Sequence, residues 1–191
     1  MRSRSERCRQ EVLDVVVDLV GEVGVERVTI EEVALRSGVA KTTIYRHWPS
    51  KQALVVEAAA TCLREVFTPN SGDLRLDLIT CFEGFIRSSR NARLDPVYPA
   101  LLAASRHDAE LARLLRQFQE ERRVPVITVL QLAQARGELP SDFDVQLAAS
   151  LLIGPIMYHK VVLHEVVDRP FIESVVDGVL AGIAAPVGAT P

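Results

Sequence analysis

Apolar and polar residues alternate at helical spacing through the first part of the chain. From Glu6 to Val23, valine and leucine recur every three or four residues, and acidic side chains occupy the opposite face. This pattern predicts an amphipathic helix that ends at Gly24, because glycine tolerates the left-handed backbone of a helix end. A second, short helix is predicted after Thr29, whose hydroxyl can accept a hydrogen bond from the amide of Glu32 while the Glu32 side chain reaches back.

The segment after Thr29 has the pattern of a helix-turn-helix. Gly38 interrupts the second helix, and helical character resumes over residues 40–47. A helix-turn-helix requires a small residue where its helices cross, a glycine in the tight turn and an apolar anchor on its second helix. Ala34, Gly38 and Ile44 meet these requirements. Three more side chains are expected on the buried side of the motif: Val33, Val39 and Trp48.

The remainder of the chain is also helical in pattern. Ser50 is a suitable N-cap for a fourth helix over residues 51–66, and the turn residues 69–72 give the clearest compositional boundary. Pro125 is expected to bend or end the helix that contains it. Further helices are predicted from the apolar stripes 78–86, 97–102 and 111–118 and from the apolar segments 145–167 and 171–183. No strand pattern occurs, so the sequence predicts an all-α protein of about nine helices.

The composition is that of an ordinary folded protein. Of the 191 residues, 48% are hydrophobic and 25% are charged. The three cysteines form no C-x-x-C pair, so neither a disulfide framework nor a cysteine-rich zinc site is expected. Asp14 and Asp18 interrupt any secretory signal, and no apolar run approaches membrane-spanning length. We therefore expect a cytoplasmic protein with no membrane partner.

The sequence lacks the common catalytic motifs. It contains no G-x-S-x-G, no glycine-rich phosphate loop and no H-E-x-x-H. His159 and His164 are five residues apart and do not share a helical face as metal ligands would. Asp108, which follows His107, is better placed as the N-cap of the next helix. We expect no enzyme activity, no metal site and no cofactor.

Basic residues are concentrated near the N-terminus. The formal net charge of −3 argues against a nucleic-acid partner, since Lys and Arg make the phosphate contacts that dominate affinity. Residues 1–51, however, hold nine Lys and Arg against eight Asp and Glu. Four of the nine are Arg2, Arg4, Arg7 and Arg9. These four form either a solvated leader or an arm that contacts DNA phosphates.

The predicted helix over residues 40–47 presents an unusual polar face. The side chains expected to point outward are Lys41, Thr42, Thr43, Tyr45, Arg46 and His47. Hydroxyls, cations and an aromatic ring are the groups that contact base edges and phosphates in a major groove. Tyr45 could instead be a core aromatic, and Arg46 could be a solvated charge or the partner of a nearby glutamate. We interpret Tyr45 as a DNA contact and Trp48 as core.

Residues Val28–Leu54, VTIEEVALRSGVAKTTIYRHWPSKQAL, resemble the DNA-binding region of TetR-type transcriptional repressors. The resemblance is close over the first sixty residues or so, and beyond them the chain agrees in helical character and length. Two positions depart from the family pattern. Ala40 stands where serine is common, so the third helix lacks a capping side chain. Trp48 stands where phenylalanine is common.

The resemblance implies a role for each polar residue of the motif. Thr42, Thr43 and Tyr45 would face bases and backbone in the groove, with Lys41 and His47 flanking them. Lys51 would meet a phosphate at the start of the fourth helix. Arg46 is expected at a phosphate, and Thr29 is expected to cap the second helix, where a phosphate contact would be additional.

The resemblance also implies a domain organisation. Residues 1–51 would form the helix-turn-helix DNA-binding domain, and residues 52–191 a helical ligand-binding and dimerisation domain. The expected protein is a homodimeric repressor, released from a pseudopalindromic operator by a small hydrophobic or amphipathic ligand. One alternative is a ligand-independent dimeric DNA-binding regulator with a packed C-terminal domain. Another is an adaptor that has lost DNA binding, against which the polar face of residues 41–47 argues.

Two further sets of candidate residues follow for the C-terminal part. An apolar cavity for a ligand would be lined by Phe82, Phe85, Ile86, Tyr98 and Leu102, although the same stripe could be plain core. The last two predicted helices are too apolar all round for surface helices, as expected where one face meets a partner. The candidates for this dimer interface are Leu151, Gly154, Pro155, Tyr158, Val175 and Leu180.

Overall fold

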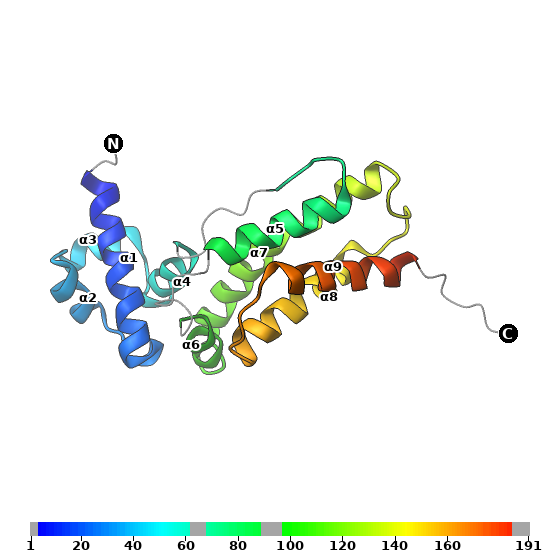
Figure 1. Ribbon diagram of the computed structural model, residues 1–191. Coiled ribbons are helices and arrows are strands. Elements are labelled where there is room, and N and C mark those ends of the chain that lie inside the picture. The colour runs from blue at the N-terminus through cyan, green and yellow to red at the C-terminus, as the bar shows by residue number, and fades with distance from the viewer. Residues whose placement is uncertain (1–3, 62–67, 89–96, 185–191) are drawn as a thin grey trace. The chain divides into compact units, whose positions relative to one another are not determined.

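The computed structural model describes the chain except for residues 1–3, 62–67, 89–96 and 185–191. Within the described residues it contains nine α-helices and no strand, as the sequence predicts (Figure 1). The helices are α1 (Arg4–Val23), α2 (Ile30–Ser37), α3 (Lys41–His47), α4 (Lys51–Thr61), α5 (Leu74–Ser88), α6 (Val97–Ala104), α7 (Ala109–Ala135), α8 (Val145–Met157) and α9 (Arg169–Ala184). A short 3-10 helix η1 (Val25–Arg27) and a π-helical turn η2 (Tyr158–Val162) complete the described elements.

The chain packs as two compact units. The first comprises residues Met1–Arg64 and Ser88–Glu121, and the second comprises Glu65–Arg87 and Arg122–Pro191. Packing therefore groups α4, α6 and the start of α7 with the first three helices. The predicted functional division falls elsewhere, after residue 51, and it stays a prediction.

The first unit is built around α1, which contacts α2, α4 and α6 (Figure 1). The valine and leucine stripe of α1 is buried as its spacing predicts, with Leu13 and Leu19 almost fully inaccessible. Leu54 of α4 and Leu101 of α6 join the same core. Glu11 and Asp14 on the opposite face of α1 are exposed, as an amphipathic helix requires.

Most of the predicted helix starts in this unit are confirmed. The Thr29 hydroxyl accepts from the Glu32 amide at 3.2 Å, Ser50 Oγ accepts from the Ala53 amide at 3.1 Å, and Asp108 Oδ1 accepts from the Leu111 amide at 2.9 Å. The predicted return contact of Glu32 to Thr29 is wrong, since the Glu32 carboxylate accepts instead from Arg36 Nε at 2.7 Å. A charged donor one turn along the helix outcompetes a backbone amide for that carboxylate.

Helix α7 does not end at Pro125. It runs unbroken from Ala109 to Ala135 with the proline inside it. Leu111 and Leu115 are buried before the proline, and Val129 and Leu130 are buried after it. Packing on both sides outweighs the one backbone hydrogen bond that a proline removes from a helix.

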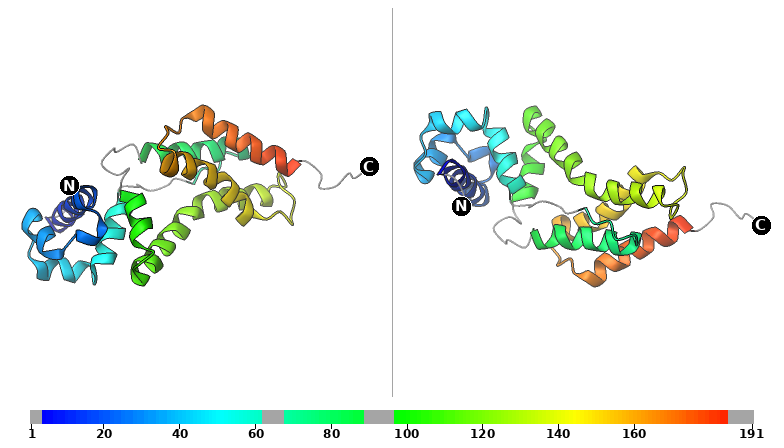
Figure 2. Two further views of the ribbon diagram at one scale, coloured as in Figure 1. Left: turned by 90° about the horizontal axis from the view of Figure 1, so that it is seen from below. Right: turned by 90° about the horizontal axis from the view of Figure 1, so that it is seen from above.

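In the second unit α8 lies beside α9, as Figures 1 and 2 both show. Its core combines buried residues of α5, the second part of α7, α8 and α9, among them Leu78, Leu130, Leu152 and Val176. Cys81 lies in this core, and burial raises the pKa of its thiol to about 12. A thiol with so high a pKa stays protonated and unreactive at neutral pH.

The prediction of one helix over residues 145–167 is wrong in its second half. Helix α8 ends at Met157 and continues as the π-helical turn η2, in which the Leu163 amide donates to the Tyr158 carbonyl at 3.1 Å. His164 then adopts a left-handed backbone with φ of 54°. His159 makes two contacts at this departure from regular helix: the centre of its ring lies 4.1 Å from that of Phe171, and its Nδ1 lies 2.9 Å from Glu165 Oε2.

One segment corrects the expectation that no apolar run approaches membrane-spanning length. In the part of the chain that the structure describes, Val145–Val162 is long and apolar enough to cross a membrane by length and composition. A single such segment is weak evidence for a span. Because little of it is buried in the fold, its apolar surface requires an explanation other than a membrane span.

Asp77 is the only buried charged residue among those described, with 1% of its surface exposed. Its two carboxylate oxygens accept from the Ser71 amide at 2.9 and 3.1 Å, which closes the turn before α5. We expect Asp77→Ala to lower the free energy of unfolding by about 1–3 kcal/mol, because it leaves a half-buried amide without its acceptor. Urea unfolding measures this, with the exposed Asp142→Ala as the matched control. Equal losses in the two variants would contradict a structural role for Asp77.

Candidate DNA-binding surface

Helices α2 and α3 form the predicted helix-turn-helix. The turn between them contains Gly38 in the left-handed region, with φ of 69° and ψ of 10°, as the motif requires. The adjacent Ser37 hydroxyl donates to the Val33 carbonyl at 2.7 Å and accepts from the Val39 amide at 3.3 Å, which fixes the turn. The sequence prediction of this turn is therefore confirmed.

Helix α3 is seated on the unit by two side chains. Ile44 is fully buried, and Trp48, which caps the C-terminal end of α3, is 3% exposed. Val33 and Val39 are buried as well, so the predicted inner side of the motif is confirmed. Ala40 precedes α3 without a side-chain cap, as its methyl group dictates.

The predicted outer face of α3 is exposed. Tyr45 exposes 52% of its surface, and Lys41, Thr42, Arg46 and His47 are exposed as well. Thr43 is half-buried beside them. The core-aromatic interpretation of Tyr45 is excluded by this exposure, whereas the core interpretation of Trp48 holds.

Two of the candidate cations already have partners within the unit. Lys41 Nζ lies 2.8 Å from Glu31 Oε1, and this hydrogen bond raises the pKa of Lys41 and lowers that of Glu31. Lys51 Nζ donates to the backbone carbonyls of Val25 at 3.3 Å and Glu26 at 3.2 Å. An ammonium has three donors, so Lys51 ties α4 to η1 while a donor remains for a phosphate.

The N-terminal arginines differ in whether they have a partner within the protein. Arg9 is ion-paired with Glu57 of α4, and its guanidinium lies 5.8 Å from the centre of the Trp48 ring. Arg7 is exposed. Arg2 and the side chain of Arg4 lie outside the described residues. The arm hypothesis therefore rests on the residues before Arg9.

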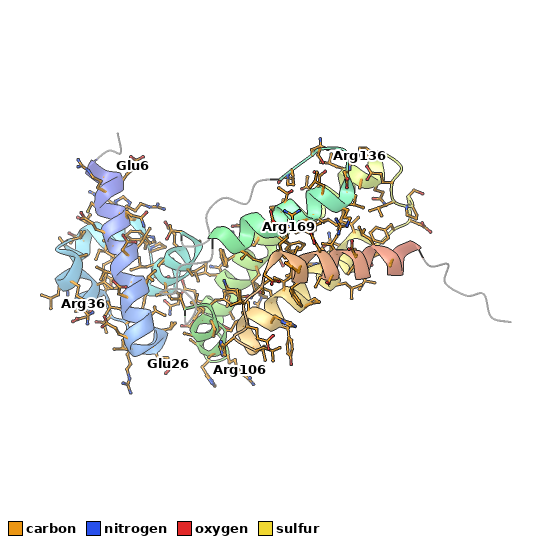
Figure 3. All side chains as sticks on the ribbon, in the orientation of Figure 1. Glu6, Glu26, Arg36, Arg106, Arg136 and Arg169 are labelled. Atoms are coloured by element: carbon orange, nitrogen blue, oxygen red, sulfur yellow. The ribbon has the colours of Figure 1, made fainter. Side chains whose placement is uncertain are left out.

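Two residues of this unit, Arg36 and Glu57, make contacts that were not anticipated from the sequence. Arg36 of α2, labelled in Figure 3, bridges Glu22 at 2.7 Å and Glu32 at 2.7 Å. The first of these ion pairs ties α2 to the end of α1. Glu57 accepts from Trp48 Nε1 at 2.7 Å. The signal for Glu57 was the tryptophan itself, because a buried indole N–H requires an acceptor where phenylalanine requires none.

The candidate ligand-binding residues fall into two hydrophobic cores. Phe82 is buried in the core of the second unit, and Ile86 packs against that core. Tyr98 and Leu102 pack against the core of the first unit, where the Tyr98 hydroxyl accepts from Gln119 Nε2 at 2.8 Å. The Phe85 side chain lies outside the described residues. These positions are consistent with plain core, and a ligand role for them stays a prediction.

The candidate dimer residues lie along one side of α8 and on α9. Leu151, Gly154, Pro155 and Tyr158 are exposed, although their neighbours Leu152 and Ile156 are buried. On α9, Val175 and Leu180 are half-buried and pack against the core of the second unit. Leu147 and Val162 extend the exposed apolar row of α8 and η2.

No cluster of three or more potential metal ligands occurs among the described residues. His159 is paired with Glu165, and Asp108 is used as a helix cap that also accepts from Gln52 at 2.6 Å. That hydrogen bond lowers the pKa of Asp108.

Comparison with known proteins agrees with this architecture. Residues 12–58 match the family model described as bacterial regulatory proteins of the tetR family, and residues 68–179 match the model of the tetracyclin repressor-like C-terminal domain. A DNA-binding transcriptional repressor TetR of Mycobacteroides abscessus is 31% identical, with 97% of this chain and 98% of the relative covered. YdeS of Bacillus subtilis, an uncharacterized HTH-type transcriptional regulator, is 27% identical over 96% of this chain and 93% of its own.

The solved structures include a similar chain. The TetR family transcription regulator SCO0332 is 33% identical, with a TM-score of 0.70, and the match covers 94% of this chain and 100% of that one. Two family models that together span most of the sequence and a full-length relative above 30% identity agree with the helix-turn-helix geometry. The chain belongs to the TetR family of DNA-binding transcriptional regulators.

Proposed function

We propose that this non-enzymatic DNA-binding regulator is a cytoplasmic, homodimeric repressor whose α3 enters the major groove of a pseudopalindromic operator. The observation that carries the proposal is the exposed polar face of α3 above its two buried anchors, Ile44 and Trp48. A short helix anchored in this way presents its side chains at a fixed angle. Thr42, Thr43 and Tyr45 supply the groups that read base edges.

The cations around α3 hold phosphates in this proposal. Arg46 and His47 lie in its last turn and are exposed, and Lys41 lies in its first turn. Lys51 is the first residue of α4, and Thr29 is the N-cap of α2. The backbone amides at the start of a helix favour an anion. Lys41 exchanges its bond to Glu31 for a phosphate at modest cost, because both partners are exposed.

The dimer in this proposal forms through the exposed apolar row of α8. Leu147, Leu151 and Tyr158 recur at helical spacing and are each about half exposed, which is unfavourable for a monomer in water. Gly154 and Pro155 lie between them and leave room for a partner helix to approach. A pseudopalindromic operator requires the two α3 helices of such a dimer to lie about 34–36 Å apart, the spacing of successive major grooves on one side of DNA.

A small hydrophobic or amphipathic ligand that releases the operator would occupy the second unit around Phe82 and Ile86. The apolar surroundings of both residues support this. The alternative, a ligand-independent regulator, is favoured by the fact that both side chains pack into cores. A thermal-shift screen separates the two, because a ligand that binds the folded state raises the melting temperature.

The experiment that tests the proposal is a gel shift of the purified full-length protein with DNA from its own upstream region. An unrelated duplex of equal length serves as competitor. A discrete shift that resists the competitor supports a sequence-specific regulator and defines the operator. If the competitor removes the shift equally well for every upstream DNA fragment, the result contradicts the proposal of a sequence-specific regulator.

Salt dependence gives a second prediction. If Lys41, Arg46 and Lys51 of both protomers meet phosphates, about six counterions are released, and operator affinity falls about 10³-fold between 50 and 200 mM salt. Fluorescence anisotropy with a labelled operator across that range measures the slope. A flat dependence would show that these cations do not contact the DNA backbone.

A further inference from the structure

Three side chains from different parts of the first unit meet at the C-terminal end of α3. The Glu57 carboxylate of α4 accepts from Trp48 Nε1 at 2.7 Å through one oxygen, and its other oxygen is ion-paired with Arg9 of α1. The Arg9 guanidinium also lies 5.8 Å from the centre of the Trp48 ring, within the range of a cation–π contact. We call these three residues the indole clamp.

The clamp contacts the helix-turn-helix at the end of α3, a short helix with one buried side chain. Helix α3 has seven residues, and Ile44 is its one buried side chain. A single anchor leaves a short helix free to rotate about its axis. The second anchor is Trp48, whose backbone amide donates to the Ile44 carbonyl at 2.9 Å, so the direction of the indole is transmitted to the last turn of α3.

The chemistry of the clamp determines the direction in which the Trp48 indole points. The indole has one N–H, and a buried N–H without an acceptor is costly, so the ring settles where the carboxylate lies. A hydrogen bond to a charged acceptor is shorter and stronger than one to a neutral acceptor. Arg9 is ion-paired with the other oxygen of the same carboxylate, which favours the position of Glu57 beside the indole. The ring of His47, which belongs to the outer face of α3, lies 5.6 Å from that of Trp48.

We propose that Glu57 is a positioning residue for operator recognition, which sets the rotation of α3 by holding Trp48 and Arg9 together. The inference rests on the proposed function, in which α3 reads bases. Tyr45 and Thr43 lie on α3, the helix that Trp48 caps, and a small rotation of α3 moves both away from the base edges at each half-site. Phosphate contacts made by long, flexible cations tolerate such a rotation.

The test compares Glu57→Ala with wild-type protein on two DNAs, the operator and an unrelated duplex of equal length. We expect operator affinity to fall about tenfold, the equivalent of one lost hydrogen bond to a charged group, while affinity for the unrelated duplex stays within about twofold. Glu120→Ala, an exposed glutamate on α7, is the matched control and should bind both duplexes as wild type does. An equal loss of affinity for both duplexes would show that Glu57 contributes only to the stability of the fold and would overturn the inference.

A spectroscopic signal reports on the clamp directly. Trp48 is the single tryptophan of the chain, so its fluorescence emission maximum reads the surroundings of one indole. Glu57→Ala should shift this maximum, and Glu120→Ala should not. An unchanged spectrum in Glu57→Ala would show that the carboxylate does not hold the ring. If Glu57→Ala does not fold, Glu57→Gln removes the charge that faces Arg9 and is tested with the same two readouts and a smaller expected loss.

A double variant separates the clamp from two independent contacts. Trp48→Phe removes the indole N–H, and we expect Trp48→Phe with Glu57→Ala to bind the operator no more weakly than the worse single variant. Additive losses would overturn the inference. If wild-type protein shows no preference for any operator, the proposed function fails and the inference with it. If wild type and Glu57→Ala prefer the operator equally, only the inference fails.

Discussion

Replacing Thr43 and Tyr45 together with alanine is expected to abolish specific operator binding while the protein stays folded and keeps its oligomeric state. Tyr45 is 52% exposed and Thr43 is half-buried, and neither is one of the buried residues that anchor α3, so neither replacement opens the core. A base contact of good geometry discriminates by about 1–3 kcal/mol, and a dimer loses its contacts at both half-sites. Operator affinity should therefore fall at least about a hundredfold, to the level of an unrelated duplex.

The measurement is anisotropy with the operator found by gel shift, with circular dichroism to verify helicity and light scattering to verify the oligomeric state. Gln117→Ala with Glu120→Ala replaces two exposed side chains of α7 in the same unit and is the control. Unchanged operator affinity in the α3 variant would show that the bases are read by other residues. A loss of helicity would show instead that Thr43 or Tyr45 supports the fold.

The parts of the molecule that the sequence predicts well are those determined by neighbours in the chain. Thr29, Ser50 and Asp108 cap helices because each places an oxygen three residues before an amide that needs an acceptor. Gly38 ends α2 for an equally local reason. The exposed and buried sides of α3 follow from helical periodicity, because one apolar residue in a seven-residue helix defines which side faces the core.

The parts that the sequence does not predict depend on contacts between distant residues. The hydrogen bonds of Lys51 to the carbonyls of Val25 and Glu26 join residues 26 and 25 positions apart in sequence, and they give a partner within the protein to a cation that the family resemblance assigns to a phosphate. Glu57 and Arg9 are 48 residues apart, and nothing in the local pattern of either indicates the other. Tertiary partners of this kind are outside the reach of periodicity and capping rules.

The same limit explains the errors in the C-terminal part. Local rules allow Pro125 either to bend or to end its helix, and α7 does not end there, because buried residues lie on both sides of the proline. Local rules also continue α8 through its apolar residues to Val167, whereas the contacts of His159 with Phe171 and Glu165 accompany an earlier end. In both cases packing decides, which is the general rule when propensity and tertiary contact conflict.

Leu151→Glu is expected to convert the proposed dimer to a monomer and to lower operator affinity at least about a hundredfold. Leu151 is 52% exposed at the middle of the apolar row that runs from Leu147 to Val162. In a monomer the new carboxylate is solvated and costs little. In the proposed dimer it is buried against apolar side chains of the partner without a compensating charge, which is strongly unfavourable.

Light scattering at micromolar concentration and anisotropy with the operator measure the two effects, and Leu76→Glu on α5 is the matched control because it places the same charge on an exposed leucine of another helix. A monomer retains one α3 for one half-site and loses the contribution of the second, which is why assembly and affinity should fall together. A Leu151→Glu protein that remains dimeric would place the interface on another surface. A monomeric protein that still binds the full operator tightly would show that one α3 suffices and would remove the reason for a symmetric operator.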